Sequence, residues 1–184
     1  MMISAIQTFN NQLQKNVKDW VNQVSMVQES GSTVDKLKMS AALKLLTQFV
    51  GKSIPFASRN GFKVIDYRLG YVKAFIPLKP NKNHFNAMYA GALFTVAELP
   101  GGIISILSFD DRFFPILKDL KIEFLKVAKT DVTVEFEISE KKLKQLEHDT
   151  INDGRCAFVL EGEIKDMGGE VVAKSYANYQ VRLR

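Results

Sequence analysis

The sequence predicts an α+β fold, in which an antiparallel sheet wraps around one long central helix and two further helices are added at the N-terminus. Three observations support this prediction. Segments after residue 61 alternate apolar and polar residues with the two-residue period of strands, and one long apolar stretch interrupts them at about residues 90–107. Residues 3–50 instead show apolar residues at helical spacing. Because an antiparallel sheet must bury one face, the apolar stretch is the element expected to fill it.

The chain has 184 residues, of which 46% are hydrophobic and 24% are charged, as in an ordinary globular protein. We expect a helical extension over residues 1–52 and a single domain over residues 53–184. The apolar stretches fall short of the ~20 uninterrupted apolar residues that a membrane-spanning helix needs. The N-terminus lacks the basic start and apolar core of a signal peptide, so a cytoplasmic location is expected.

Charge and cysteine content narrow the function classes further. The formal net charge of +5 suits an anionic ligand, but the basic residues are not clustered with aromatic ones, so nucleic-acid binding is not expected. The single cysteine, Cys156, excludes an intrachain disulfide and fits a reducing compartment. Cys156 is interpreted as a small core residue rather than a nucleophile.

The two N-terminal helices are predicted from apolar residues three or four positions apart. The first spans residues 3–28, and the second spans residues 34–50 after a break at "ESGST". Binding to a membrane surface is one interpretation of such amphipathic helices. Because their polar faces are not strongly basic, packing on the domain or on a partner subunit is favoured.

Six strands are predicted after these helices. The first two, "FKVIDYR" and "YVKAFIP", flank Leu69 and Gly70 and are expected to form a hairpin. The others are expected at residues 117–127, 131–139, 155–164 and 170–183. In the fourth strand, at residues 131–139, apolar and polar residues alternate strictly, which indicates a sheet with one buried face. Residues 140–149 are interpreted as a short solvated helix or a mobile loop.

The central stretch, "NHFNAMYAGALFTVAELPGG", contains one carboxylate, Glu98, in an otherwise almost uncharged run. An ionised carboxylate inside an apolar helix costs several kcal/mol unless a neighbour pairs with it. Glu98 is therefore either a structural carboxylate, bonded to a neighbouring strand or across a dimer interface, or a group that takes part in chemistry. Pro100 is expected to remove a helical hydrogen bond just after it.

This stretch resembles the helix-opening motif of hotdog-fold thioesterases, in particular the PaaI-like branch. In that branch His-Gly-Gly opens the central helix, and an Asp or Glu follows nine residues after the His. Here Tyr89, Ala90 and Gly91 occupy the opening, with Tyr89 in place of His and Ala90 in place of the first Gly, and Glu98 follows nine residues after Tyr89. The run "LKIEFLKVAKTDVTVEFEI" resembles the third and fourth strands of the family, and the resemblance covers residues 61–184.

The resemblance implies hydrolysis of an acyl thioester, with acyl-CoA as the expected substrate. The free N–H groups of Ala90 and Gly91 at a helix start suit the developing negative charge on a thioester carbonyl. Glu98 would act as general base or nucleophile, and burial would raise its basicity. Asn83, at an offset where some family members carry Asn or Gln, would position water or substrate.

Other residues are candidates for binding the substrate. His84 and Tyr89 lie beside the helix start, and Tyr89 would donate a hydrogen bond where the family has His. The basic residues Lys121 and Lys126 are candidates for the phosphates of coenzyme A, with solvated strand edges as the alternative. The resemblance also implies a site shared between two subunits, hence a homodimer or a dimer of dimers.

Competing motifs are missing from the sequence. It contains no G-x-S-x-G elbow, no phosphate-binding Walker loop and no G-x-G-x-x-G after a strand. Two histidines and one cysteine make a nitrogen- or sulfur-rich zinc site improbable, and no cofactor is expected. The main alternative is a non-catalytic hotdog protein that binds acyl-CoA or a fatty-acyl chain. A hotdog dehydratase or isomerase would be expected to keep a His near the carboxylate, which Tyr89 argues against.

Overall fold

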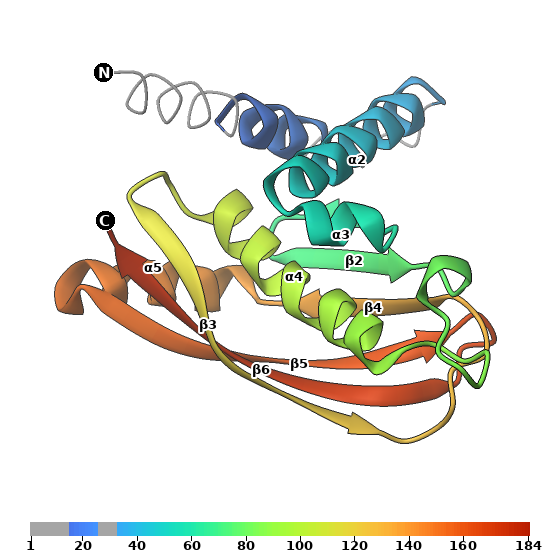
Figure 1. Cartoon of the computed structure of the whole chain (residues 1–184). Coiled ribbons are helices and arrows are strands. Elements are labelled where there is room, and N and C mark those ends of the chain that lie inside the picture. The colour runs from blue at the N-terminus through green and yellow to red at the C-terminus, as the bar shows by residue number, and fades with distance from the viewer. Residues whose placement is uncertain (1–14, 26–32) are drawn as a thin grey trace, which may run out of the picture.

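A computed structural model of the chain describes residues 15–25 and 33–184. Six antiparallel strands form one sheet in the order β1-β2-β4-β5-β6-β3, and helix α4 packs against it (Figure 1). The predicted α+β architecture, a sheet around a long central helix, is confirmed. The strands are β1 (Lys63–Arg68), β2 (Tyr71–Ile76), β3 (Phe113–Phe124), β4 (Val132–Glu137), β5 (Arg155–Asp166) and β6 (Val171–Leu183), and the helices are α2 (Thr33–Ser53), α3 (Pro55–Arg59), α4 (Ala90–Ser108) and α5 (Glu140–Asp153).

The predicted hairpin joins β1 and β2 through Leu69 and Gly70. Gly70 has a φ of +76°, and a Cβ atom there would lie 2.2 Å from the carbonyl oxygen of Ile138. Only glycine fits a left-handed backbone with so close a neighbour. The hairpin therefore packs directly against the end of β4.

Strand β3 begins at Phe113, earlier than the predicted start at residue 117. Pro115 lies inside it, opposite Val181 of β6. Proline is tolerated because β3 is at the edge of the sheet, where one side of the strand has no ladder to complete. Pro115 is therefore the reason why the predicted start of this strand was too late.

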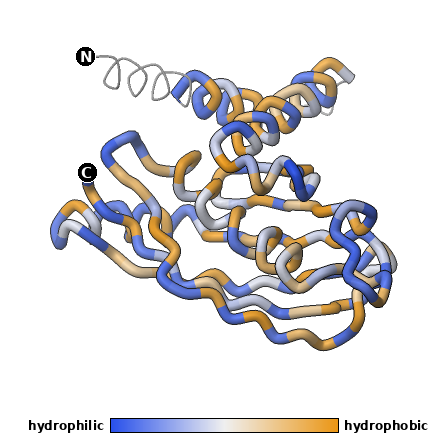
Figure 2. Tube along the Cα trace, in the orientation of Figure 1, coloured by the Kyte–Doolittle hydropathy of each residue, from blue (hydrophilic) through white to orange (hydrophobic). Residues whose placement is uncertain are grey.

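Helix α4 fills the concave face of the sheet, and its start at Ala90 agrees with the prediction. Val96, Ile104 and Leu107 are at most 2% exposed, and each such buried side chain contributes about 1.5–3 kcal/mol to stability. The helix continues unbroken through Pro100. By length and composition α4 could cross a membrane, but it is mostly buried as the core helix of the domain. Hydrophilic residues mark the turns at the ends of the sheet (Figure 2).

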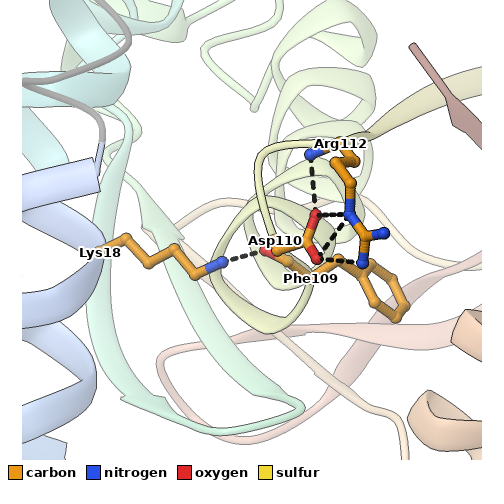
Figure 3. A network of polar contacts seen from close by, with 4 residues as sticks. All are labelled: Lys18, Phe109, Asp110 and Arg112. Carbon is orange, nitrogen blue, oxygen red and sulfur yellow. Dashed lines mark hydrogen bonds and ion pairs between the residues drawn. The ribbon is translucent and has the colours of Figure 1, made fainter.

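The helical residues 15–25 lie over the C-terminal end of α4. The other residues of the first predicted helix, 3–14 and 26–28, lie outside the described part of the chain. Asn22 donates to the carbonyl of Leu107 at 3.0 Å and accepts from the hydroxyl of Tyr67 at 2.6 Å. The ammonium of Lys18 donates to the carbonyl of Phe109 (Figure 3). Since the last carbonyls of a helix have no intrahelical donors, these contacts satisfy them from another element.

The turn after α4 is held by an ion pair (Figure 3). The guanidinium of Arg112 contacts the carboxylate of Asp110 at 2.7 Å, and hydrogen bonding to Arg112 lowers the pKa of Asp110. Both side chains are exposed, so this contact orders the turn more than it stabilises the fold.

The segment interpreted as a short helix or a mobile loop forms α5. The hydroxyl of Ser139 accepts from the backbone N–H of Lys142 at its start, and Gly154 ends it in a left-handed conformation. Leu143 and Leu146 are buried beneath it. Two well-placed leucines anchor an otherwise charged helix.

Candidate active site

The start of α4 presents two unpaired backbone donors. Tyr89 precedes the helix in an extended conformation, and its carbonyl accepts from Ala92 at 2.9 Å and Leu93 at 3.3 Å. Among the described residues, the N–H groups of Ala90 and Gly91 have no acceptor. They lie at the positive end of the helix dipole, so they are available to an oxyanion or a carbonyl oxygen.

The ring of Tyr89 lies over Gly91. A Cβ atom on Gly91 would be 2.5 Å from this ring, and the Tyr89 side chain is 59% exposed. The aromatic side chain of Tyr89 thus lies directly beside the free donors, with most of its surface open.

The loop before α4 is organised by Asn83. Its side-chain oxygen accepts from the backbone N–H groups of Phe85 at 2.9 Å and Ala87 at 3.1 Å. Asn83 therefore clamps the loop, and only its NH₂ group remains to contact water or substrate. An asparagine that accepts from the backbone two residues on is a known turn pattern, so this structural role was readable from the sequence.

His84 projects from the same loop. Its ring lies 3.9 Å from that of Phe85, centroid to centroid, and both side chains are exposed. His84 is close along the chain to the helix start, but within the described chain it has no hydrogen-bond partner that would orient it.

Glu98 lies on the face of α4 that the sheet does not cover. The same face carries Gly91, Phe94 and Gly102, spaced three to four residues apart and all at least partly exposed. Glu98 itself is half-buried, and its carboxylate has no hydrogen-bond or ion-pair partner among the described residues. Burial raises its pKa. The described residues therefore contain no partner for the Glu98 carboxylate on a neighbouring strand. A partner across a dimer interface stays an alternative.

The backbone around Glu98 is fixed by Tyr179 of β6. The Tyr179 hydroxyl donates to the carbonyl of Glu98, and its ring packs so closely on Gly101 that a Cβ there would lie 2.3 Å away. Phe158, the cross-strand neighbour on β5, stacks with the same ring, 5.5 Å between centroids. Sequence reasoning missed Tyr179, because no spacing rule links positions that are 81 residues apart.

Exposed apolar side chains gather near the start of α4. The N–H of Met88 donates to the carbonyl of Ala128 at 2.9 Å, which ties the turn after β3 to the loop before the helix. Phe94 on α4 faces Phe124 at the end of β3, 6.5 Å between ring centroids. Phe94 and Phe124 are 40% and 53% exposed, Leu125 is half exposed, and Val127 is more than half exposed. This apolar surface adjoins both the free donors and Glu98's face of the helix.

Comparison with known proteins agrees with this architecture. Residues 42–181 match the family described as a domain of unknown function, DUF4442. The chain belongs to the DUF4442 family. No curated protein matches it.

Solved structures extend the comparison. The DUF4442 chain is 40% identical to PA5026 of Pseudomonas aeruginosa, described as a "Probable Thioesterase", with a TM-score of 0.73 and coverage of 77% of this chain and 95% of that one. It also resembles thioesterase HI1161 of Haemophilus influenzae at 15% identity, a TM-score of 0.62 and coverage of 77% and 90%. Thioesterase SAV0944 of Staphylococcus aureus matches at 17% identity, a TM-score of 0.58 and coverage of 70% and 98%. The expected hotdog fold is confirmed; the last two likenesses concern the fold alone.

The two lysines expected near coenzyme A phosphates are both paired in this DUF4442 protein. Lys121 contacts Glu123 at 2.6 Å, which raises the pKa of Lys121, and it lies over the ring of Tyr176. Lys126 pairs with Glu170. Both pairs are exposed, and such pairs contribute about 0–1 kcal/mol. The role of these lysines stays a prediction.

Cys156 is only partly buried and lies at the margin of the core rather than inside it. Desolvation raises the pKa of its thiol. A thiol with a raised pKa holds its proton near neutral pH, so it makes a poor nucleophile.

Proposed function

We propose that this protein hydrolyses acyl thioesters, that acyl-CoA is its substrate, and that Glu98 is the general base or nucleophile. One observation carries the proposal: a half-buried carboxylate without a partner in the described chain follows two unpaired N–H groups on the same helix. The likeness to PA5026, a probable thioesterase at 40% identity, supports the reaction class.

The chemistry follows from these groups. The thioester carbonyl accepts hydrogen bonds from the N–H groups of Ala90 and Gly91, which stabilise the negative charge that develops on its oxygen. Glu98 takes a proton from water as the water oxygen bonds to the carbonyl carbon. The C–S bond then breaks, and the thiolate takes up a proton, which leaves a carboxylic acid and a thiol. In the nucleophilic variant, Glu98 bonds to the carbonyl carbon first, and the C–S bond breaks to release the thiolate, which takes up a proton. Water then hydrolyses the resulting anhydride to the carboxylic acid and regenerates Glu98.

The spacing along α4 suits a bound carbonyl between the two groups. Glu98 follows Gly91 by seven positions, which is about 10 Å along the helix axis. Helical side chains lean toward the N-terminus, so the carboxylate approaches the donors. A chain of donor, carbonyl, water and carboxylate spans roughly 8 Å. The raised pKa of Glu98 fits a group that must accept a proton.

Substrate contacts are assigned around this centre. The free NH₂ of Asn83 would orient the water, while the exposed rings of His84 and Tyr89 would contact the thioester. Lys121 and Lys126 would leave their carboxylate partners for the phosphates of coenzyme A, since exposed ion pairs are weak and easily exchanged.

The protein would act as a homodimer or a dimer of dimers. Strand β3 is a twelve-residue edge strand, and an edge of this length is a template for pairing with another chain. Its end adjoins the exposed pair Phe94 and Phe124. A second copy at this edge would bury both the apolar surface and the open face of α4, which completes the site. A cytoplasmic location fits coenzyme A thioesters as substrates.

A non-catalytic acyl-CoA binding protein is the second candidate, and the replacement of His and Gly by Tyr89 and Ala90 favours it. The two are separated by incubating the full chain with acyl-CoAs of short, long and aromatic chains, and measuring both thiol release and binding. Thiol release above the uncatalysed rate supports the hydrolase. Binding with no release for any chain supports the binding protein and makes Glu98 structural.

A further inference from the structure

Helix α2 has a second apolar face that nothing in the described chain covers. Met39, Leu46 and Val50 are buried toward the domain, whereas Val34 and Leu37 are 58% and 67% exposed on the other side. Ala41 and Leu45 are also exposed. The four apolar residues are spaced three or four positions apart along the helix. At 3.6 residues a turn, the four share an arc of about 80°. These four residues are the outer stripe of α2. Figure 2 shows that apolar and hydrophilic residues are interspersed along this helix.

Lysines surround the outer stripe. Lys38 and Lys44 lie on its two flanks, and Lys52 lies in line with it two turns beyond Leu45. All three are exposed, and within the part of the chain that the structure describes none of them forms an ion pair. Their long apolar stems allow the aliphatic part to cover the stripe's margins while the ammonium groups reach outward.

The whole net charge of the protein belongs to this region. Residues 33–63 contain six Lys or Arg and one carboxylate, which gives +5, and the rest of the chain contains 19 residues of each sign. All six cationic side chains are exposed. The net positive charge of the protein therefore lies on α2, α3 and the start of β1, and the charges of the rest of the chain balance.

We propose that the outer stripe of α2 docks the protein onto an anionic phospholipid surface. A helix with an aliphatic stripe and flanking lysines lies in the plane of such a surface, where buried apolar area and attraction to anionic headgroups add. The inner face stays packed on β1, at the opposite edge of the sheet from β3 (Figure 1). Docking through α2 therefore leaves β3 and the open face of α4 accessible.

Other occupants fit this face less well. A second copy would bring the lysines of two chains together, which is repulsive. Residues 1–14 carry no charged side chain, so they offer no counter-charge. Protein interfaces are enriched in Tyr, Trp and Arg and depleted in Lys, whereas this stripe is aliphatic and its flanks are lysines. An acidic protein is therefore an outcome for the test rather than the proposal.

The test is sedimentation of the full chain with phosphatidylcholine vesicles and with vesicles that contain 30 mol% phosphatidylglycerol. We expect binding to the anionic vesicles, weakened by salt. Lys38→Ser with Lys44→Ser should lower the partition coefficient about 25-fold, at about fivefold a lysine. Leu37→Ser with Leu45→Ser should lower it at least tenfold. The matched control is Lys141→Ser with Lys144→Ser, two exposed lysines of α5, which should lower it less than threefold.

Three results would overturn the proposal. One is no binding of the wild type to anionic vesicles at low salt. Another is equal loss in the α2 and α5 lysine variants, which would mean nonspecific charge attraction. The third is binding to soluble polyglutamate that depends on the lysines of α2, with no binding to vesicles, which would assign the face to an acidic polypeptide. Circular dichroism of each variant checks that the surface substitutions leave the fold intact.

Discussion

The hydroxyl of Tyr179 donates a hydrogen bond to the backbone carbonyl of Glu98, so strand β6 fixes the turn of α4 that carries the carboxylate. The contact is tight, because the Tyr179 ring occupies the space where any side chain on Gly101 would begin. Strand and helix are thus locked beside the proposed catalytic group, and the position of Glu98 depends on a residue far from it in sequence.

Tyr179→Phe tests this link. It removes one hydrogen bond and leaves the ring in place, so the free energy of unfolding should fall by about 1 kcal/mol. If Glu98 is catalytic, the thioesterase kcat/KM should also fall roughly tenfold, since small displacements of a catalytic group are costly. Tyr176→Phe, on the opposite face of the same strand, is the control and should change neither quantity. Equal effects in the two variants would contradict the account.

The neighbouring glycines of α4 make a second pair. Gly101→Ala places a methyl group 2.3 Å from the Tyr179 ring, so the variant should lose about 1–3 kcal/mol of stability. Gly102→Ala meets no atom within 4 Å, and alanine is the better helix former by about 1 kcal/mol. Denaturant unfolding of both should therefore give shifts of opposite sign. A destabilisation of Gly102→Ala as large as that of Gly101→Ala would show that the packing of α4 is different.

The raised pKa of Glu98 predicts a pH dependence of stability. Burial raises this pKa above its ordinary value of about 4.5, so the folded state binds the proton more tightly than the unfolded state. The contribution of the group to stability is complete below pH 4.5 and is lost as the pH rises through the raised pKa. Glu98→Gln has no such loss, so its Tm relative to wild type should increase between pH 4 and pH 8. A difference in Tm that is constant with pH would mean that the carboxylate is not desolvated.

Residues 15–25 should stabilise the domain through the end of α4. Asn22→Ala removes a donor to Leu107 and the acceptor of the buried Tyr67 hydroxyl, so it should cost about 1–3 kcal/mol. Tyr67→Phe should cost about 1 kcal/mol. Gln23→Ala, exposed on the same helix, is the control. Unfolding curves that do not separate Asn22→Ala from Gln23→Ala would show that this helix does not cap α4.

The sequence carried enough periodicity to predict the main elements. The apolar run around Glu98 predicted the start of α4 at Ala90, and the turn residues at Gly70 placed the first hairpin. Two boundaries were harder. Pro115 hid the first residues of β3, because proline is acceptable only once the strand is known to be an edge. The charged composition of α5 left its helix undecided until Leu143 and Leu146 were seen to be buried.

Only the site residues that lie close together in the sequence could be predicted. Ala90, Gly91 and Glu98 lie on one helix, so helix geometry relates them directly. Tyr179 and Phe124 reach the same helix through strand pairing, which no local pattern specifies. The outer stripe of α2 was also hidden, because apolar residues on two faces of one helix read as a single amphipathic pattern until burial separates them.

The most direct measurement of the central claim is the rate of thiol release from the preferred acyl-CoA by wild type and by Glu98→Gln at equal folded concentration. We predict a loss of at least a hundredfold in kcat with Glu98→Gln, since a general base alone contributes about 10²–10⁴-fold. Glu161→Gln, an exposed carboxylate on β5, is the control and should retain wild-type activity. Thiol release by Glu98→Gln at the wild-type rate would contradict the account and would make Glu98 a structural residue of the hotdog core.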